Sequence, residues 1–283
     1  MLELQEQYRD LPIAVIDDVY SSATDSLERY YKIGDYDAMP SVTTVLEMIN
    51  KPRLREWNMN RALDYLGGKY ATRHWDNRIA TPPWVRYPKS PKAQSLRKKV
   101  KTTWNDALAS LRRNAKAHPI KVRDYAGDIG TEVHEAIAAE LRGESWELVS
   151  ESAAIAMQSY RLWQEDSTIH PIWTEQTVWS LEYGYAGSAD LVGMDGSKLV
   201  VLDWKTGAGV YNEAGLQMAA YSHAIEEMTL CKVDECVVVH LNKSTPAWTE
   251  HKVKDWKRSF NGFLSALNTW KLWHDGVFTS DDS

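Results

Sequence analysis

The chain has 283 residues, of which 43% are apolar and 25% are charged, and its formal net charge is -6. This length is enough for one large domain or two modest ones, and the composition is ordinary for a globular protein. No apolar run approaches the roughly 20 residues that span a bilayer, so we expect no membrane partner. The N-terminus has neither a secretory nor a transit pattern, so we expect a cytoplasmic location.

Charge is distributed unevenly along the chain. Residues 1–50 contain three basic and ten acidic side chains, whereas residues 71–118 contain twelve basic and two acidic ones. Such a basic stretch indicates contact with a polyanion, although a solvated charged helix would look similar. The two cysteines, Cys231 and Cys236, are too few for a four-cysteine site, so we expect reduced thiols and no iron–sulfur cluster.

The first half of the chain is predicted to begin with two short strands, at 12–18 and 29–34. A helix over 39–49 follows, with Ser41 or Thr43 as its N-cap. Further helices are expected over the ranges 52–66, 91–117 and 127–141. Proline and glycine set the boundaries, because Gly67-Gly68 ends the first of these helices and His118-Pro119 the basic one. The proline-rich residues 69–90 are predicted to be a loop.

The second half is predicted to hold most of the strands. A helix at 150–166 precedes a strand at 172–180 and a hairpin at 187–207 that turns at Asp195-Gly196-Ser197. A helix at 212–228, strands at 235–242 and 247–253, and a helix from about Asp255 to His274 complete the chain. This order predicts an α/β fold with a central mixed β-sheet flanked by helices, plus a basic helical arm.

The hairpin carries two carboxylates and an ammonium among its apolar residues. Asp190 lies on the first strand, and Asp203 and Lys205 lie two residues apart on the second, so they point to the same side. A carboxylate pair can hold Mg²⁺ or Mn²⁺, the backbone carbonyl of Trp204 can add an oxygen ligand, and a lysine can orient water. The alternative is that Asp190 caps a turn and Lys205 is a solvated residue at a strand end.

The motif GSAD, followed by DWK and then by QMAAY in the next helix, resembles the PD-(D/E)xK nuclease superfamily, specifically its RecB-like branch. The resemblance implies a restriction-endonuclease-like core. It also implies that Gln217 and Tyr221, on one helix face, help to orient the DNA and the active site. Without the other motifs, this pair would be interpreted as a polar helix face beside a core tyrosine.

Two further candidate metal ligands lie upstream of the hairpin. The G-x-x-x-H pattern from Gly130 to His134 resembles the histidine motif of the same branch, and imidazole can complete a carboxylate metal site. A lone helical histidine is more often structural. Glu175, on the preceding strand, is a weaker candidate, because a polar residue on an alternating strand explains it nearly as well.

The segment from Arg29 to Leu46 resembles the family of the mitochondrial genome maintenance exonuclease and its bacteriophage relatives. Within it, Ser41 and Thr43 are candidate DNA contacts. The chain has no phosphate-binding G-x-x-x-x-G-K-[ST] motif, so any helicase or recombination activity would belong to a partner. We expect the chain to be a stand-alone nuclease from a phage or a bacterium that acts in the bacterial or phage-infected cell.

These motifs together predict one nuclease domain over 1–283, with a basic arm at 69–120 and the catalytic core at 121–275. The expected activity is metal-dependent exonuclease cleavage of single-stranded DNA with free ends. Charge and aromatic rings in the arm suit single strands, and the candidate contacts are Trp84, Arg97, Lys98, Lys99 and Lys101. The alternatives are an endonuclease or flap nuclease of the same fold, or a non-catalytic single-strand DNA-binding recombination accessory protein.

Overall fold

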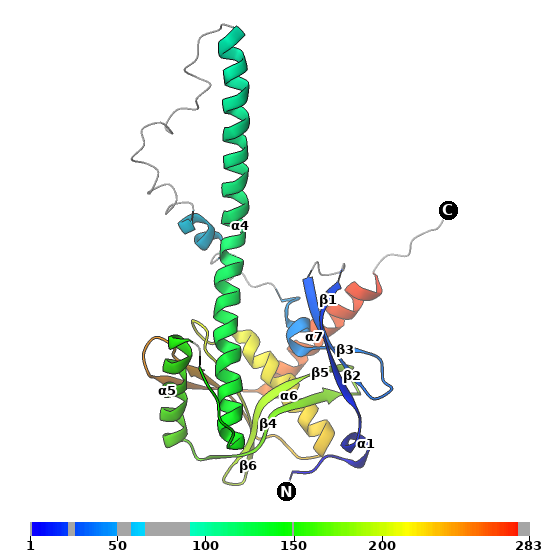
Figure 1. The fold of residues 1–283 in the computed structure, drawn as a ribbon. Helices are drawn as coiled ribbons and strands as arrows, with labels where there is room; N and C mark the ends of the chain where they lie inside the picture. The colour runs from blue at the N-terminus through cyan, green and yellow to red at the C-terminus, as the bar shows by residue number, and fades with distance from the viewer. Residues whose placement is uncertain (1, 22–25, 50–57, 66–90, 149, 277–283) are drawn as a thin grey trace, which may run out of the picture. The chain divides into compact units, whose positions relative to one another are not determined.

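The computed structural model describes most of the chain, and Figure 1 shows its fold. Residues 91–108 and residues 18, 26, 112, 116 and 123 are described by their backbone alone. The described ranges are 2–21, 26–49, 58–65, 91–148 and 150–276. Residues 1–50 and 129–283 form one compact unit, and residues 51–128 form a second. Among the described helices, none is both long and apolar enough to cross a membrane.

The larger unit is built on a five-stranded mixed sheet, as the sequence predicted. Its strands lie in the order β4-β5-β6-β7-β8, and only β6 and β7 run parallel. Their bounds are β4 Ile169–Ser180, β5 Tyr185–Asp195, β6 Lys198–Lys205, β7 Glu235–Leu241 and β8 Trp248–Lys252. The predicted hairpin is therefore the β5–β6 pair, and Gly196 permits its tight turn with a φ of 59°.

Helices cover both faces of this sheet, because side chains on a strand alternate between the faces. On one face, α6 (Asn212–Thr229) and α7 (Trp256–Asp275) pack over residues such as Val201 and Val238. On the other, α5 (Glu151–Asp166) and the last turns of α4 (Pro91–Arg142) pack over residues such as Leu202 and Val239.

The basic helix does not end at His118-Pro119 as predicted. The helix α4 runs continuously from Pro91 to Arg142, with Pro119 inside it, and includes the range 127–141 that we expected to be a separate helix. A single internal proline removes one backbone hydrogen bond and can bend a helix without ending it. No glycine pair or other turn signal accompanies Pro119, and the helix continues through it.

The N-terminal part forms a second, three-stranded antiparallel sheet. It consists of β1 (Ile13–Ser21), β2 (Ser26–Ile33) and the two-residue β3 (Met39–Pro40), preceded by the short helix α1 (Glu6–Arg9). The predicted helix at 39–49 is shorter than expected, since α2 covers Val42–Leu46. Ser41 is its N-cap, and its hydroxyl accepts a hydrogen bond from the Thr44 amide.

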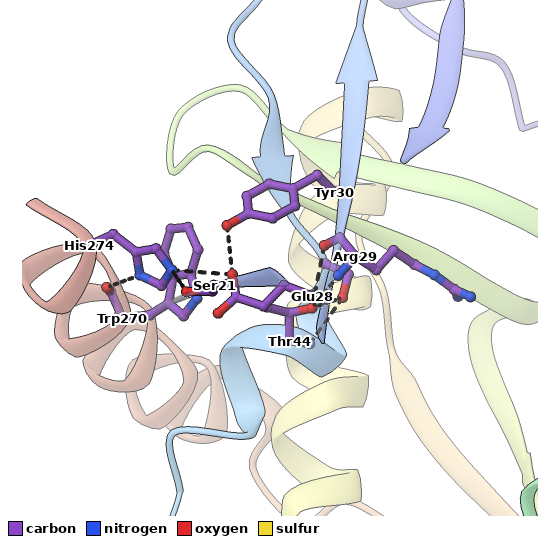
Figure 2. Close-up of polar contacts among 8 residues, drawn as sticks. Ser21, Glu28, Arg29, Tyr30, Thr44, Trp270 and His274 are labelled. Atoms are coloured by element: carbon purple, nitrogen blue, oxygen red, sulfur yellow. Dashed lines mark hydrogen bonds and ion pairs between the residues drawn. The ribbon is translucent and has the colours of Figure 1, made fainter. Parts of the chain in front are cut away.

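Figure 2 shows how polar groups connect β2 to α7. The buried Glu28 carboxylate accepts a hydrogen bond from the Tyr30 hydroxyl at 2.6 Å and lies 3.2 Å from His274 Nε2. The Ser21 hydroxyl lies 3.0 Å from the same nitrogen. A buried carboxylate needs such partners, so this network holds the small sheet against the C-terminal helix.

Candidate active site

Asp190 and Asp203 lie where the pairing between β5 and β6 ends. Leu191 and Leu202 are the last paired residues at this end, and the two aspartates come next on their strands. Both are buried, with residue exposures of 6% and 1%. The Trp204 amide donates a 2.7 Å hydrogen bond to Asp190 Oδ2. The end of the β5–β6 pairing therefore holds two carboxylates close together at the edge of the core.

The helix α6 supplies the groups that hold Asp203. Gln217 Nε2 donates to Asp203 Oδ1 at 3.3 Å and to the Tyr221 hydroxyl at 2.9 Å. Lys205 Nζ lies 2.6 Å from Asp203 Oδ2. The structure thus brings together the four residues of the D-x-K and Q-x-x-x-Y patterns, which the resemblance to the superfamily implied.

His134 and Glu175 complete the group around Asp190. His134 Nδ1, on α4, lies 3.2 Å from Asp190 Oδ2. The register of β4 with β5 places Glu175 opposite Asp190, and its carboxylate accepts a 3.3 Å hydrogen bond from Ser188. One ligand atom each from His134, Glu175 and Asp190 lies within 4.8 Å of the others.

Glu175 has a strained backbone, which the sequence did not indicate. Its φ is 51°, in the left-handed region that residues with a Cβ atom seldom occupy. Such strain costs about 1–2 kcal/mol and persists at functional sites when the surroundings impose it. Here the conformation accompanies the placement of the carboxylate beside Asp190.

The crowded charges change the pKa values of the site. Burial raises the pKa of Asp203 to about 6 despite the neighbouring Lys205. Partial burial and the charge of Asp190 raise that of Glu175 to about 7, although this side chain also faces solvent. Burial opposes the protonation of His134, but the charge of Asp190 outweighs it and raises the pKa to about 9. The same pairing lowers the pKa of Asp190 against the effect of burial.

These groups line one open pocket with a volume of about 490 Å³. The N-terminal segment reaches it because Ser41 forms an isolated parallel bridge with Ala186 on β5. Thr43 lies exposed on the pocket wall, whereas Ser41 is buried and caps α2. DNA contact by either residue stays a prediction.

Two arginines of the pocket were missed by the sequence analysis. Arg29 lies on β2 and pairs with Asp17, and Arg142 lies at the end of α4 and pairs with Glu144. In the sequence, each arginine looks like an ordinary charged surface residue, because nothing local relates it to the hairpin. Only the packing of β2 and α4 around the strand ends brings the two guanidinium groups to the pocket.

Several predicted site residues lie outside this description. Trp84 belongs to a range that is not described, and the side chains of Arg97, Lys98, Lys99 and Lys101 are likewise outside the described part. The Trp204 indole packs in the core, 4.8 Å from the Trp163 ring between centroids. The predicted role of the Trp204 carbonyl as a ligand stays untested.

The donor set is suited to a divalent cation. Three carboxylates and one imidazole converge on a pocket open to solvent, and the cationic groups Lys205 and His134 lie against the two buried aspartates. Hard and borderline divalent ions such as Mg²⁺ and Mn²⁺ take oxygen ligands with few or no imidazoles. His134, Glu175, Asp190 and Asp203 are the residues that could hold such an ion.

The family is given by comparison with known sequences. The model of the PD-(D/E)XK nuclease superfamily matches residues 106–268, which include the whole hairpin, His134 and α6. The chain belongs to the PD-(D/E)XK nuclease superfamily. The predicted superfamily and the predicted α/β fold with a mixed sheet are therefore confirmed.

Comparisons with curated sequences and with solved structures do not narrow the function further. No curated protein sequence matches the chain significantly. Among solved structures, an alkaline exonuclease from Laribacter hongkongensis is similar at 12% identity, over 50% of this chain and 80% of that one, with a TM-score of 0.29. Similarity at this level supports no inference about the activity of this chain.

Proposed function

We propose that the chain is a divalent-metal-dependent exonuclease that hydrolyses phosphodiester bonds of single-stranded DNA from free ends. The chain belongs to a superfamily of nucleases. The observation that carries the proposal is that one pocket brings together three carboxylates, a lysine and an imidazole: Glu175, Asp190, Asp203, Lys205 and His134. Such an arrangement suits hydrolysis with water as the nucleophile, without a covalent enzyme intermediate.

The metal would be held by His134, Glu175, Asp190 and Asp203. When bound, Mg²⁺ or Mn²⁺ supplies positive charge at the phosphate and lowers the pKa of a coordinated water. The protein residues do the positioning. Asp190 is fixed by the Trp204 amide, and Asp203 is fixed by Gln217.

Lys205 would orient the attacking water and stabilise the negative charge that develops on the phosphate. Its ammonium lies against Asp203, so it is held at the metal-binding carboxylate. Tyr221 holds the Gln217 amide from the far side and so restricts its rotation. In the reaction, water adds to phosphorus, the bond from phosphorus to the leaving oxygen breaks, and that oxygen takes up a proton.

The direct test compares Lys205→Ala and Asp203→Asn with the unchanged chain on single-stranded DNA. We expect each substitution to lower the rate at least about a thousandfold while DNA binding survives, because both act on the reacting phosphate. Lys232→Ala, which removes an exposed lysine, is the matched control. EDTA should abolish cleavage, and added Mg²⁺ or Mn²⁺ should restore it. Full activity in both active-site variants would refute the proposal.

A second substrate set separates the exonuclease from its alternatives. Linear strands labelled at either end and closed circular single strands are digested side by side. We expect degradation of the linear strands alone. Rapid cutting of the circle would indicate an endonuclease, and binding without any cleavage would indicate an accessory protein or a requirement for a partner.

A further inference from the structure

A second group of metal-binding side chains lies outside the pocket. Glu182 follows β4 in the turn to β5, and His223 and Glu227 lie four residues apart on one face of α6. One ligand atom from each of the three lies within 4.8 Å of the others. None of these residues lines the active-site pocket, so the group is independent of the proposed nuclease activity.

The two oxygens of the Glu227 carboxylate have different surroundings. Oε1 accepts hydrogen bonds from the Tyr8 hydroxyl at 3.0 Å, the Leu181 amide at 2.8 Å and the Glu182 amide at 3.2 Å. Oε2 is buried and has no hydrogen-bond partner among the described residues. The carboxylate is thus held rigidly by one oxygen, and the other oxygen is available to a ligand.

His223 presents a second atom of the same kind. Its Nε2 is also buried without a hydrogen-bond partner in the described part of the chain, and it lies 3.9 Å from Glu227 Oε2. The ring stacks on Phe260, with centroids 4.0 Å apart and planes 17° apart, so its orientation is fixed. Buried polar atoms in folded proteins almost always have a partner, and here two of them face one gap.

The His223 and Glu227 side chains do not satisfy each other by a direct hydrogen bond. A separation of 3.9 Å is too long for a hydrogen bond. Ligand atoms around one tetrahedral ion with bonds of about 2.0–2.2 Å lie roughly 3.3–3.6 Å apart, so a small inward movement of the two side chains would let one ion bind both atoms.

We propose that Glu182, His223 and Glu227 bind one Zn²⁺ ion. One imidazole and two carboxylates suit a borderline transition-metal ion better than Mg²⁺, and water would complete a tetrahedral shell. The ion would connect α6 to the β4–β5 turn and, through the hydrogen bond of Tyr8 to Glu227, to the N-terminal segment. Its role is therefore structural.

The test measures Zn²⁺ binding by titration calorimetry and thermal unfolding on the full chain without a polyhistidine tag. His134→Gln with Asp190→Asn provides the background, because these changes remove two ligands of the active site. We expect this variant to bind one Zn²⁺ and to unfold at a higher temperature with the ion. Adding Glu182→Gln, on an exposed turn, should weaken binding at least about tenfold, and adding His223→Ala should abolish it.

The control is His170→Ala, which removes an exposed histidine from β4 and should leave Zn²⁺ binding unchanged. If His223→Ala fails to fold, Glu182→Gln decides the question, since its side chain lies at the surface. Failure of the background variant to bind Zn²⁺, or binding that neither substitution changes, would overturn the proposal and leave an ordered water as the occupant of the gap.

Discussion

At the scale of single residues, the active site combines buried charge with backbone strain. Asp203 is almost completely buried beside Asp190, and Glu175 holds a left-handed conformation next to both. Each of these features costs stability in a metal-free protein. A bound cation would offset the repulsion between the carboxylates. Substitutions that relieve the charge or the strain should therefore stabilise the metal-free protein and lower its activity.

Replacing Glu175 by asparagine should separate these two effects. Asparagine tolerates the left-handed region better than glutamate and carries no charge, so the metal-free protein should gain about 1 kcal/mol in its free energy of unfolding. Mg²⁺ affinity and cleavage rate should fall at least about tenfold. Urea unfolding and a cleavage assay measure the two quantities.

Gln176→Asn is the control for this variant, since Gln176 is the next residue on the strand and no positive φ occurs there. It should change neither stability nor activity by a comparable amount. A Glu175→Asn protein that is less stable than the unchanged chain would show that the strain is not relieved as argued.

The pKa shifts predict how metal-free stability depends on pH. Asp203, Glu175 and His134 all have raised pKa values in the fold, near 6, 7 and 9. A raised pKa contributes stability that is present at low pH and is lost as the pH rises through the folded value. Asp203 and Glu175 lose this contribution as the pH rises to about 6 and 7, and His134 loses it between pH 6.5 and about 9. In EDTA, the melting temperature should therefore fall as the pH rises to about 9, and the fall above pH 7 should come from His134.

Mg²⁺ should reverse this trend, because deprotonated carboxylates bind it and protons compete with it. The increase in melting temperature on adding Mg²⁺ should be larger at about pH 8.5 than at pH 6. A variant with Glu175→Gln and Asp203→Asn should lose the Mg²⁺ effect and keep only the part of the decline that His134 causes, below about pH 9. Equal Mg²⁺ stabilisation at both pH values would contradict the assignment of these ligands.

At the scale of helices and strands, the site depends on the close approach of α6 to β5. A Cβ atom on Gly187 would lie 2.5 Å from Cε1 of Tyr221, whose ring is buried. The absence of a side chain at Gly187 therefore permits Tyr221 to reach Gln217, and through it to hold Asp203. A glycine on one element thus controls the geometry of a carboxylate on another.

Gly187→Ala should destabilise the protein by about 1–3 kcal/mol, because the added methyl group would overlap the buried Tyr221 ring and force it or the strand to shift. Cleavage should fall as well, since displacement of Tyr221 releases Gln217. Gly209→Ala is the control, because nothing lies within 4 Å of its Cβ position. Thermal unfolding and activity are measured on both variants; an unchanged Gly187→Ala protein would refute this account of the packing.

The small N-terminal sheet has an analogous role at this scale. Arg29 directly follows Glu28, whose carboxylate lies against His274 (Figure 2), and the Arg29 amide bonds the Thr44 hydroxyl. These contacts fasten β2 both to α7 and to α2. The arginine that lines the pocket is therefore supported by elements from both ends of the chain.

At the scale of the whole molecule, the chain forms two compact units, and the basic stretch at 71–118 belongs to the smaller one. We propose that the basic segment contacts the single strand, and four of its side chains test this: Arg97, Lys98, Lys99 and Lys101. Their joint replacement by glutamine should weaken binding of single-stranded DNA and make the affinity less dependent on salt. The reason is that binding then neutralises fewer phosphates and releases fewer counterions from the DNA. Fluorescence anisotropy at several salt concentrations measures both effects.

The control replaces four exposed basic residues of the larger unit by glutamine: Lys232, Lys254, Lys257 and Arg258. The net charge of the control equals that of the test variant, so only the position of the charges differs. We expect DNA binding by the control to remain close to that of the unchanged chain. Equal loss in both variants would indicate a general charge effect and exclude a specific arm.

The sequence by itself determined the local structure and the superfamily. Apolar runs on either side of the turn at Gly196 predicted the hairpin. The resemblance of the ordered motifs to a known superfamily implied that Asp190, Asp203, Lys205, Gln217, Tyr221 and His134 form one site. The strands and helices can be predicted locally because their periodicity acts over neighbouring residues, whereas the grouping of the site residues rests on the resemblance of their motifs. The prediction that the basic helix ends before Pro119 was wrong. One proline weakens a helix but does not end it when no other turn residue is present.

Only the tertiary structure decided which distant groups meet at the site. The strain at Glu175, the fit of Tyr221 against Gly187, and the arrival of Arg29 and Arg142 in the pocket all depend on how separate elements pack. The gap between His223 and Glu227 likewise depends on the β4–β5 turn that saturates one carboxylate oxygen. Such contacts join residues far apart along the chain, so no local pattern in the sequence records them.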